Sequence, residues 1–384
     1  MKKTRIFFWN LLILLITIPF ILFLFEGYFR FFNPQLTILR AEKVSLQIYE
    51  PSNYTPWKLK PNTQGNLIPA YGNEYDVPVK INSIGLRDYE INQSELTSKS
   101  IIEFIGDSFT FGYGVYLEDT YHKKIESMLN KDKKKFRTIN LGFADGAYTT
   151  DIQYLYLKEK WPSFNPKIVV LGYYVGNDIL DFEKHNWTKQ DANLNPLTIT
   201  SNFYYVDDKS RLRKWFEIEV HKGFLYKMDR ILSKYSHIWV FLKRAYIGLF
   251  LVDPVPNHLI NYPEGYNKNL LKSERMLNQI NKLTKSYNTT LIVLLIPTKT
   301  QILDSDWEIY KKFYGPNVNR FNPQYNIITF CKNKNIRCID LLPEFLGKKD
   351  LYFKKEGHWN EKGHALAAQI LYEYLVENKL VDVS

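Results

Sequence analysis

Four short polar motifs carry the residue types that could do chemistry in this chain. A serine and a histidine are the most informative of them, because a serine hydroxyl becomes a good nucleophile only when a base accepts its proton. An asparagine and several carboxylates complete the motifs. Three motifs follow apolar runs and the fourth precedes the last expected helix: Gly106-Asp107-Ser108, Gly142 to Gly146, Gly176-Asn177-Asp178 and Glu356-Gly357-His358-Trp359-Asn360.

The elements between these motifs explain how they would meet. Short apolar strands alternate with helices from about residue 100, which predicts a parallel sheet covered on both faces. In such sheets the reactive groups collect at the carboxyl ends of the strands, so the ordered motifs indicate one site rather than ordinary turns. We expect strands at 101–105, 137–141, 167–172, 291–296 and 336–340, and helices at 118–130, 150–160, 267–286, 323–333 and 361–378.

The N-terminus has the pattern of a membrane anchor. An uncharged apolar stretch, 6–25, follows Lys2, Lys3 and Arg5. Twenty residues at about 1.5 Å each span about 30 Å, the thickness of the hydrocarbon core of a bilayer. No small-residue cleavage pattern follows it, and the charges ahead of it favour a cytoplasmic N-terminus. We therefore expect a retained single-pass helix, with the rest of the chain outside the cytoplasm.

The remaining organisation is predicted in three parts after the stub and anchor at 1–30. Residues 31–96 are expected to form an irregular, partly β extension, and 97–380 a catalytic domain. Within that domain the strand–helix rhythm is lost at about 180–265, which indicates an insertion. An amphipathic helix from Phe224 to Leu242 predicts a small helical subdomain there, and a lid or a membrane-surface contact is the alternative.

Composition excludes some classes of function and leaves others open. The formal net charge is +11, but the basic residues form no tract longer than 131–135 and no nucleic-acid-binding motif organises them. We therefore expect no nucleic-acid partner. His358 and His364 lack the spacing of a zinc-binding helix, and no phosphate- or dinucleotide-binding loop is present, so we expect no metal and no cofactor. Pairing of Cys331 with Cys338 stays open.

The motifs together resemble those of the SGNH/GDSL hydrolase family over about 97–380. The block at 106–115 looks like the first block of that family, 175–178 is similar to its third, and His358-Trp359-Asn360 with Gly363 resembles its last. The segment 85–87 is similar to the approach segment of membrane-anchored bacterial members. The resemblance implies an α/β fold of the flavodoxin-like, three-layer α/β/α type, and the hydrolysis or transfer of acyl groups.

The resemblance also implies roles for individual residues. Ser108 would be the nucleophile, His358 its general base, and a carboxylate would orient the imidazole. The oxyanion hole would use the backbone N–H of Ser108, the backbone N–H of a glycine in the second block, and the Asn177 side chain. No metal ligand is implied.

Two departures from the family pattern leave alternatives open. Family members usually carry Asp two or three residues before the histidine, whereas Glu356 stands there in this chain. Glu356 could still reach His358, the enzyme could rely on a Ser-His dyad, and Asp350 is a remote substitute. The second block is about one residue longer than usual, so Gly146 is the better match for the oxyanion glycine and Gly142 the alternative.

The leading hypothesis is a membrane-anchored serine esterase or deacetylase that acts outside the cytoplasm on O-acyl esters, such as acylated carbohydrates of the cell envelope. The alternative is an O-acyltransferase that modifies an extracytoplasmic polysaccharide beside a membrane partner that exports acyl groups. A second alternative is an envelope protein that kept the fold and lost the chemistry.

Overall fold

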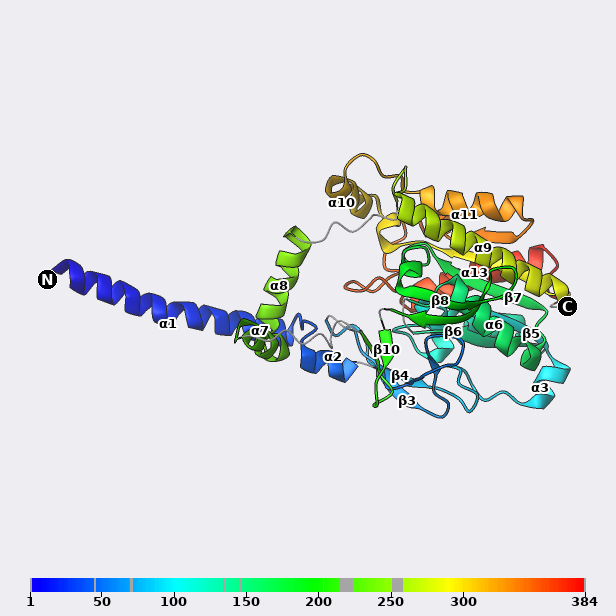
Figure 1. Cartoon of the computed structure of the whole chain (residues 1–384), viewed down its shortest axis with the longest axis horizontal. Helices are drawn as coiled ribbons and strands as arrows, with labels where there is room; N and C mark the ends of the chain where they lie inside the picture. Colours follow the sequence, from blue (N-terminus) through cyan, green and yellow to red (C-terminus); the bar gives the residue numbers. More distant parts are fainter. Residues whose placement is uncertain are drawn as a thin grey trace. The chain divides into compact units, whose positions relative to one another are not determined.

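The computed structural model describes residues 2–44, 46–69, 72–133, 135–144, 147–202, 204–214, 224–250 and 258–382. The chain divides into two compact units (Figure 1). We call them the sheet unit, which comprises Leu46–Leu67, Val77–Ile218 and Val255–Ser384, and the helical unit, which comprises Met1–Ser45, Ile68–Asp76 and Glu219–Pro254. The polar motifs all lie in the sheet unit.

The centre of the sheet unit is a five-stranded parallel sheet with the strand order β13-β12-β7-β5-β6. Numbered along the chain, these strands run 2-1-3-4-5 across the sheet, which is the flavodoxin-like order. The predicted fold class is confirmed, and each expected strand is present. The bounds are β5 (Ser100–Gly106), β6 (Phe136–Gly142), β7 (Ile168–Tyr174), β12 (Thr290–Ile296) and β13 (Arg337–Asp340).

The strands are apolar along almost their whole length because both faces of the sheet are covered. Every residue of β6 is buried, as are all residues of β5 and β12 except the first. Glu103 is the one ionisable residue of β5, and its side chain is fully buried in the middle of the strand. Burial raises the pKa of Glu103 to about 8, so this group is neutral at pH 7.

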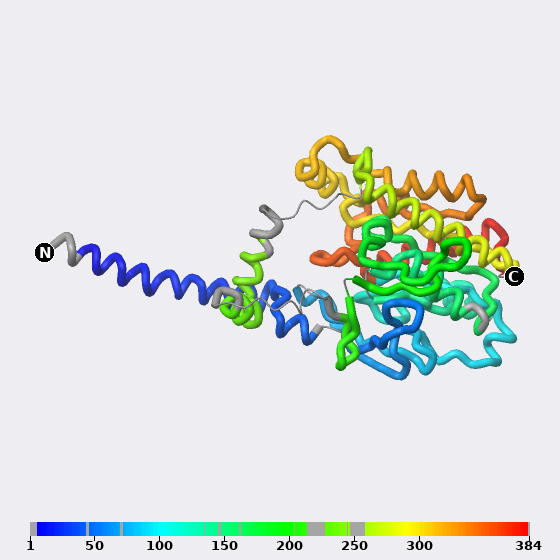
Figure 2. The backbone as a smooth tube through the Cα atoms, in the orientation of Figure 1, coloured from blue at the N-terminus to red at the C-terminus, as the bar shows by residue number. Residues whose placement is uncertain are grey.

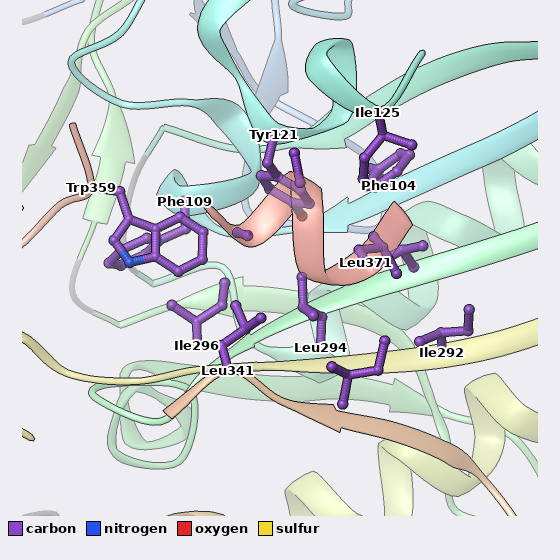
Figure 3. Close-up of a cluster of buried hydrophobic side chains, with 14 of the residues drawn as sticks. Phe104, Phe109, Tyr121, Ile125, Ile292, Leu294, Ile296, Leu341, Trp359 and Leu371 are labelled. Carbon is purple, nitrogen blue, oxygen red and sulfur yellow. The ribbon is translucent and has the colours of Figure 1, made fainter. Parts of the chain in front are cut away.

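Helices α5 (Tyr121–Leu129) and α13 (Glu361–Glu377) pack against each other on one face of the sheet. Their apolar side chains meet those of the strands in a buried cluster, which Figure 3 shows around Phe104, Tyr121, Leu294 and Leu371. The backbone N–H of Tyr121 also donates to the imidazole of His364, 243 residues later. Helix α5 and the last helix of the sheet unit are therefore joined in one core, and Figure 2 traces the backbone between them.

On the other face, α6 (Thr150–Phe164) packs against α9 (Glu264–Ser286), and α11 (Asn322–Asn333) packs against β13. The expected helices end within a few residues of those observed. A further helix, α10 (Asp304–Tyr314), has no counterpart among the expected elements. Cys331 on α11 and Cys338 on β13 are free thiols.

The predicted extension and insertion contain more β-structure than their irregular sequence indicates. Residues 31–96 hold α2 (Ile38–Val44), α3 (Gln93–Ser98) and two antiparallel pairs. The insertion begins with two further antiparallel pairs and becomes helical from Phe224. The strands are β1 (Tyr49–Glu50), β2 (Lys58–Leu59), β3 (Gln64–Leu67), β4 (Val77–Lys80), β8 (His185–Gln190), β9 (Pro196–Ser201), β10 (Tyr204–Val206) and β11 (Leu212–Lys214).

The helical unit contains α1 (Lys2–Phe31), the one helix in the described part of the chain that is long and apolar enough to cross a membrane. Its apolar span, Ile6–Phe31, has a mean hydropathy of 2.6 and no buried share. Within the same unit, Glu26 accepts hydrogen bonds from the backbone N–H groups of His237 and Ile238. These are the first N–H groups of α8 (His237–Phe250). Glu26, near the C-terminal end of α1, therefore caps this helix of the insertion.

That cap divides the amphipathic segment predicted at Phe224–Leu242 into two helices. The first helix is α7 (Phe224–Tyr235), and Ser236 follows it. The Ser236 hydroxyl accepts a hydrogen bond from the backbone N–H of Trp239 and donates one to Glu26. A serine that satisfies the N–H groups of the following turn starts a new helix there.

Candidate active site

Ser108 stands at the carboxyl end of the strand β5, on a sharp strand-to-helix turn. Asp107 is the N-cap of the short helix α4 (Ser108–Phe111), and its carboxylate accepts a hydrogen bond of 2.9 Å from the backbone N–H of Phe109. The turn requires a small residue before it, because a Cβ on Gly106 would overlap Thr110 and lie 2.9 Å from the carbonyl oxygen of Gly172. The turn fixes the direction of the serine side chain, which is almost fully buried.

His358 and Glu356 are carried by a closed loop that precedes α13. Tyr352 and Trp359 form an isolated antiparallel bridge, and the backbone N–H of Phe353 donates to the carbonyl oxygen of His358 at 3.0 Å. After the loop, the Asn360 side chain accepts hydrogen bonds from the backbone N–H groups of residues 362 and 363 and begins α13. The histidine is therefore held between a bridge and a capped helix.

The structure brings the three predicted residues into one hydrogen-bonded chain. His358 Nε2 lies 2.8 Å from Ser108 Oγ, and His358 Nδ1 lies 3.1 Å from Glu356 Oε2. With the ring proton on Nδ1 donated to Glu356, Nε2 can accept the proton of the serine hydroxyl. Glu356 thus stands where a triad acid stands, and its extra methylene is accommodated. The remote substitute, Asp350, contributes its backbone carbonyl oxygen to Asn360 instead.

The structure describes two of the predicted oxyanion donors, Ser108 and Asn177. The backbone N–H of Ser108 is at the start of α4, and Asn177 lies in the turn that follows β7 at the same edge of the sheet. Gly142 packs against α4, and its N–H already donates to the Asn140 side chain at 2.8 Å. Gly142 is therefore a close-packing glycine in this structure. Gly146, the other candidate, lies outside the described residues.

One family model matches part of the chain. Residues 257–382 match the family model described as SGNH hydrolase-like domain, acetyltransferase AlgX. Over these residues the chain is similar to an SGNH hydrolase-like domain. The match includes Glu356 and His358 and begins after Ser108. No curated protein matches the chain.

Solved structures similar to the chain include esterases, at low similarity. The psychrotrophic esterase EstA from Pseudoalteromonas sp. is 13% identical with a TM-score of 0.39, over 74% of this chain and 100% of that chain. The acetylxylan esterase Axe2 from Geobacillus stearothermophilus is 12% identical with a TM-score of 0.36, over 73% of this chain and 94% of that chain. The fold of the sheet unit is defined by its own strand order.

Two aromatic rings pack against the imidazole of His358. Tyr113 is stacked on His358 with ring centroids 4.7 Å apart, and Phe109 lies against the same ring at 5.2 Å. Phe109 in turn packs edge-on against Trp359 (Figure 3). The sequence did not single out Tyr113, although its position five residues after Ser108 was a usable signal.

A buried arginine supports the loop that carries Tyr113. The Arg87 guanidinium donates to the carbonyl oxygens of Phe111, Gly112 and Val115 at 2.6–2.8 Å. Burial lowers the pKa of Arg87 to about 9, and the nearby Glu118 partly offsets this effect. The segment 85–87, which the sequence indicated as a feature of the family, therefore contains the arginine that stabilises the loop of Tyr113.

Two buried carboxyl groups lie behind the nucleophile. Burial raises the pKa of Asp107 to about 6, against hydrogen bonding from Phe109 and the charge of His358. Burial, together with the charge of Asp107, raises the pKa of Asp178 well above its usual range, although the Tyr174 N–H donates to it at 3.0 Å. Asp107 is the N-cap of α4, and its carboxylate accepts the backbone N–H of Phe109.

A cavity of about 420 Å³ opens beside Glu356. Its walls come from the ends of β7 and β12, from α10, from His258 and from the loop before His358. The lining residues are Tyr174, Gly176, His258, Thr298, Lys299, Thr300, Tyr310, Lys354, Lys355, Glu356 and Gly357. The cavity thus adjoins the loop that carries Glu356, and neither Ser108 nor His358 is among its lining residues.

Proposed function

We propose that this chain is a membrane-anchored serine esterase of the SGNH type, which removes acyl groups from O-acylated carbohydrates outside the cytoplasm. The hydrogen-bonded chain from Glu356 through His358 to Ser108 carries the proposal. A serine at the end of a strand, bonded to a histidine that is bonded to an acid, is the arrangement that acyl transfer requires.

In the proposed reaction, Ser108 Oγ attacks the carbonyl carbon of the ester while its proton passes to His358 Nε2. The tetrahedral intermediate collapses when His358 returns that proton to the departing alcohol, which leaves an acyl group on Ser108. Water then attacks the acyl carbon, gives its proton to His358, and the serine leaves with the proton restored. Glu356 stabilises the charged imidazolium in both halves of the cycle.

The charge on the carbonyl oxygen would be met by the backbone N–H of Ser108 and by the Asn177 side chain. The N-terminus of α4 supplies a favourable dipole at the same point. Loss of one such donor typically costs about 3–4 kcal/mol of transition-state stabilisation, so Asn177→Ala should lower kcat by two to three orders of magnitude, roughly. Gly146 is proposed as the third donor.

Hydrolysis of nitrophenyl acetate by the purified full-length chain in detergent tests this function. The wild type should release nitrophenol and should react with a fluorophosphonate probe, whereas Ser108→Ala should do neither. Equal labelling of the two proteins would show that the serine is not activated. In that case the protein would be a non-catalytic envelope component.

An O-acyltransferase is the second candidate, and the description of the matching family model as an acetyltransferase favours it. The same acyl-serine would form, and a sugar hydroxyl would replace water in the second half of the cycle. Such an enzyme would need an acyl donor outside the cytoplasm, which a membrane partner that exports acyl groups could supply. Acetylation of the envelope polysaccharide should rise in a deletion strain if the enzyme is an esterase and fall if it is a transferase.

The apolar helix α1 supports the proposed location. With Lys2, Lys3 and Arg5 ahead of it, the positive-inside rule leaves the N-terminus in the cytoplasm and the sheet unit outside. Protease added to spheroplasts should then degrade the sheet unit while the inner membrane is intact. Protection of the sheet unit until the membrane is opened would contradict this topology.

A further inference from the structure

The fourth strand of the sheet ends in a rigid turn that presents a lysine toward the candidate site. Strand β12 ends at Ile296, and Thr298 and Gln301 form a capping box around the turn at Lys299–Gln301. The Gln301 side chain is further bonded to Gln324 at 2.8 Å. The backbone of Lys299 is thus fixed at the same sheet edge as Ser108, where functional groups collect in parallel sheets.

The ammonium group of Lys299 is bonded to the backbone of a single loop. Its Nζ donates to the carbonyl oxygens of Phe353 at 2.7 Å and Lys354 at 2.6 Å, and the carbonyl oxygen of Glu356 lies at 3.5 Å. A lysine ammonium carries three N–H donors, so one side chain can hold more than one carbonyl oxygen of the loop. Hydrogen bonds from a charged donor are roughly twice as strong as neutral ones.

This loop is the segment that carries Glu356 and His358. Its ends are closed by the bridge between Tyr352 and Trp359, but the bridge does not reach residues 354–357. Lys299 joins the middle of the loop to the turn that follows β12. Its hydrogen bonds restrict the backbone of the loop close to Glu356, whose carboxylate must meet His358 Nδ1.

We propose that Lys299 is a positioning residue, which holds the backbone of the loop so that the Glu356 carboxylate stays on His358. The proposal rests on the proposed function, since it concerns the rate of the reaction at Ser108. Lys299 also lines the cavity beside the site, so the competing role is direct binding of substrate. The two roles predict different kinetics.

The test compares Lys299→Met with Lys348→Met in the full-length chain. Methionine keeps the apolar stem and removes the N–H donors, whereas the Lys348 side chain is half-exposed and its ammonium lies 3.7 Å from the Glu344 carboxylate. We expect Lys299→Met to lower kcat by about 10- to 100-fold, because a misplacement of about 1 Å can cost 100-fold. KM should stay within about twofold, and Lys348→Met should match the wild type.

A double-mutant cycle with Glu356→Ala decides between the roles. If Lys299 acts through Glu356, then Lys299→Met should have almost no further effect once the carboxylate is gone. A raised KM at unchanged kcat, or a full loss of rate in the Glu356→Ala background, would overturn the proposal. Lys299→Gln, which keeps two N–H donors, provides the same comparison if Lys299→Met does not fold cooperatively.

Failure of this inference is separable from failure of the proposed function. If the wild type and Ser108→Ala are both inactive and label equally, the function and the positioning role fall together. If the wild type is active, Ser108→Ala is inactive and the cycle is additive, only the positioning role falls.

Discussion

Replacing Glu356 tests the least expected member of the candidate triad. In the transition state the imidazole of His358 becomes positively charged, and the Glu356 carboxylate stabilises that charge from 3.1 Å. At an effective dielectric constant of about 20, two unit charges at that separation interact by about 5 kcal/mol. The side chains are 25% and 10% exposed, so solvent screening should reduce this to about 2–3 kcal/mol.

That energy corresponds to a fall in kcat of roughly 30- to 150-fold for Glu356→Ala, since each 1.36 kcal/mol is about tenfold. Glu356→Gln should be at least as slow, because its amide can donate to Nδ1 and hold the imidazole in the wrong tautomer. KM should change little in either variant. Initial rates with nitrophenyl acetate and rates of fluorophosphonate labelling measure the effect.

Glu344→Gln is the matched control, because Glu344 has the same side chain, is largely exposed and pairs only weakly with Lys348. It should leave the rate unchanged. If both Glu356 variants stay within about threefold of the wild type, the carboxylate does not assist His358 and the enzyme works with a Ser-His dyad. If Glu356→Asp is faster than the wild type, the longer side chain is a compromise rather than a requirement.

Three further predictions concern stability and the support of the site. Burial raises the pKa of Glu103 to about 8 from its ordinary value of 4.5. Between these two pH values the folded chain binds more protons than the unfolded chain, so the stability of the fold decreases as pH rises from 4.5 to 8. Glu103→Gln should therefore increase the unfolding free energy by a few kcal/mol at pH 9 and by nothing at pH 4, as measured by urea unfolding; an equal gain at both values would contradict the assignment. Arg87→Met should lower the unfolding free energy by about 3 kcal/mol, because three carbonyl oxygens lose a charged donor, and a loss below about 0.5 kcal/mol would refute that role. Tyr113→Leu should lower kcat by about fivefold at unchanged stability, because the lost ring contact with His358 is worth about 1 kcal/mol. An unchanged kcat would show that the contact does not support the imidazole.

The sheet and its order of elements were predictable because both depend on local patterns. Runs such as 291–296 are apolar along their whole length, and only strands covered on both faces tolerate that composition. The placement of Ser108 and His358 followed from motifs at the ends of such runs. Whether Glu356 reaches the histidine depends on the path of one loop, which no spacing rule determines.

The supporting contacts of the site could not be read from the sequence. Lys299 precedes the loop residues that it contacts by 54–57 residues, and Tyr113 contacts His358 from the loop after the first strand of the parallel sheet. Lys299 lies outside the four motifs. Tyr113 lies in the block at 106–115, but its contact with His358 arises from packing. The strands β8 and β9 were missed for another reason: they lie where the alternation of apolar strands and helices is lost, and β8 is rich in polar residues.

The 250 residues between Ser108 and His358 have a consequence for how the protein matures. The nucleophile belongs to the first sheet strand to be synthesised, and its base arrives just before the last helix. Closing so long a segment is entropically costly and slow, and it requires the intervening strands to be in place. A nascent or truncated chain that lacks roughly the last 30 residues contains Ser108 but not His358. Reactivity at Ser108 therefore reports that folding is complete, and not only that it has begun.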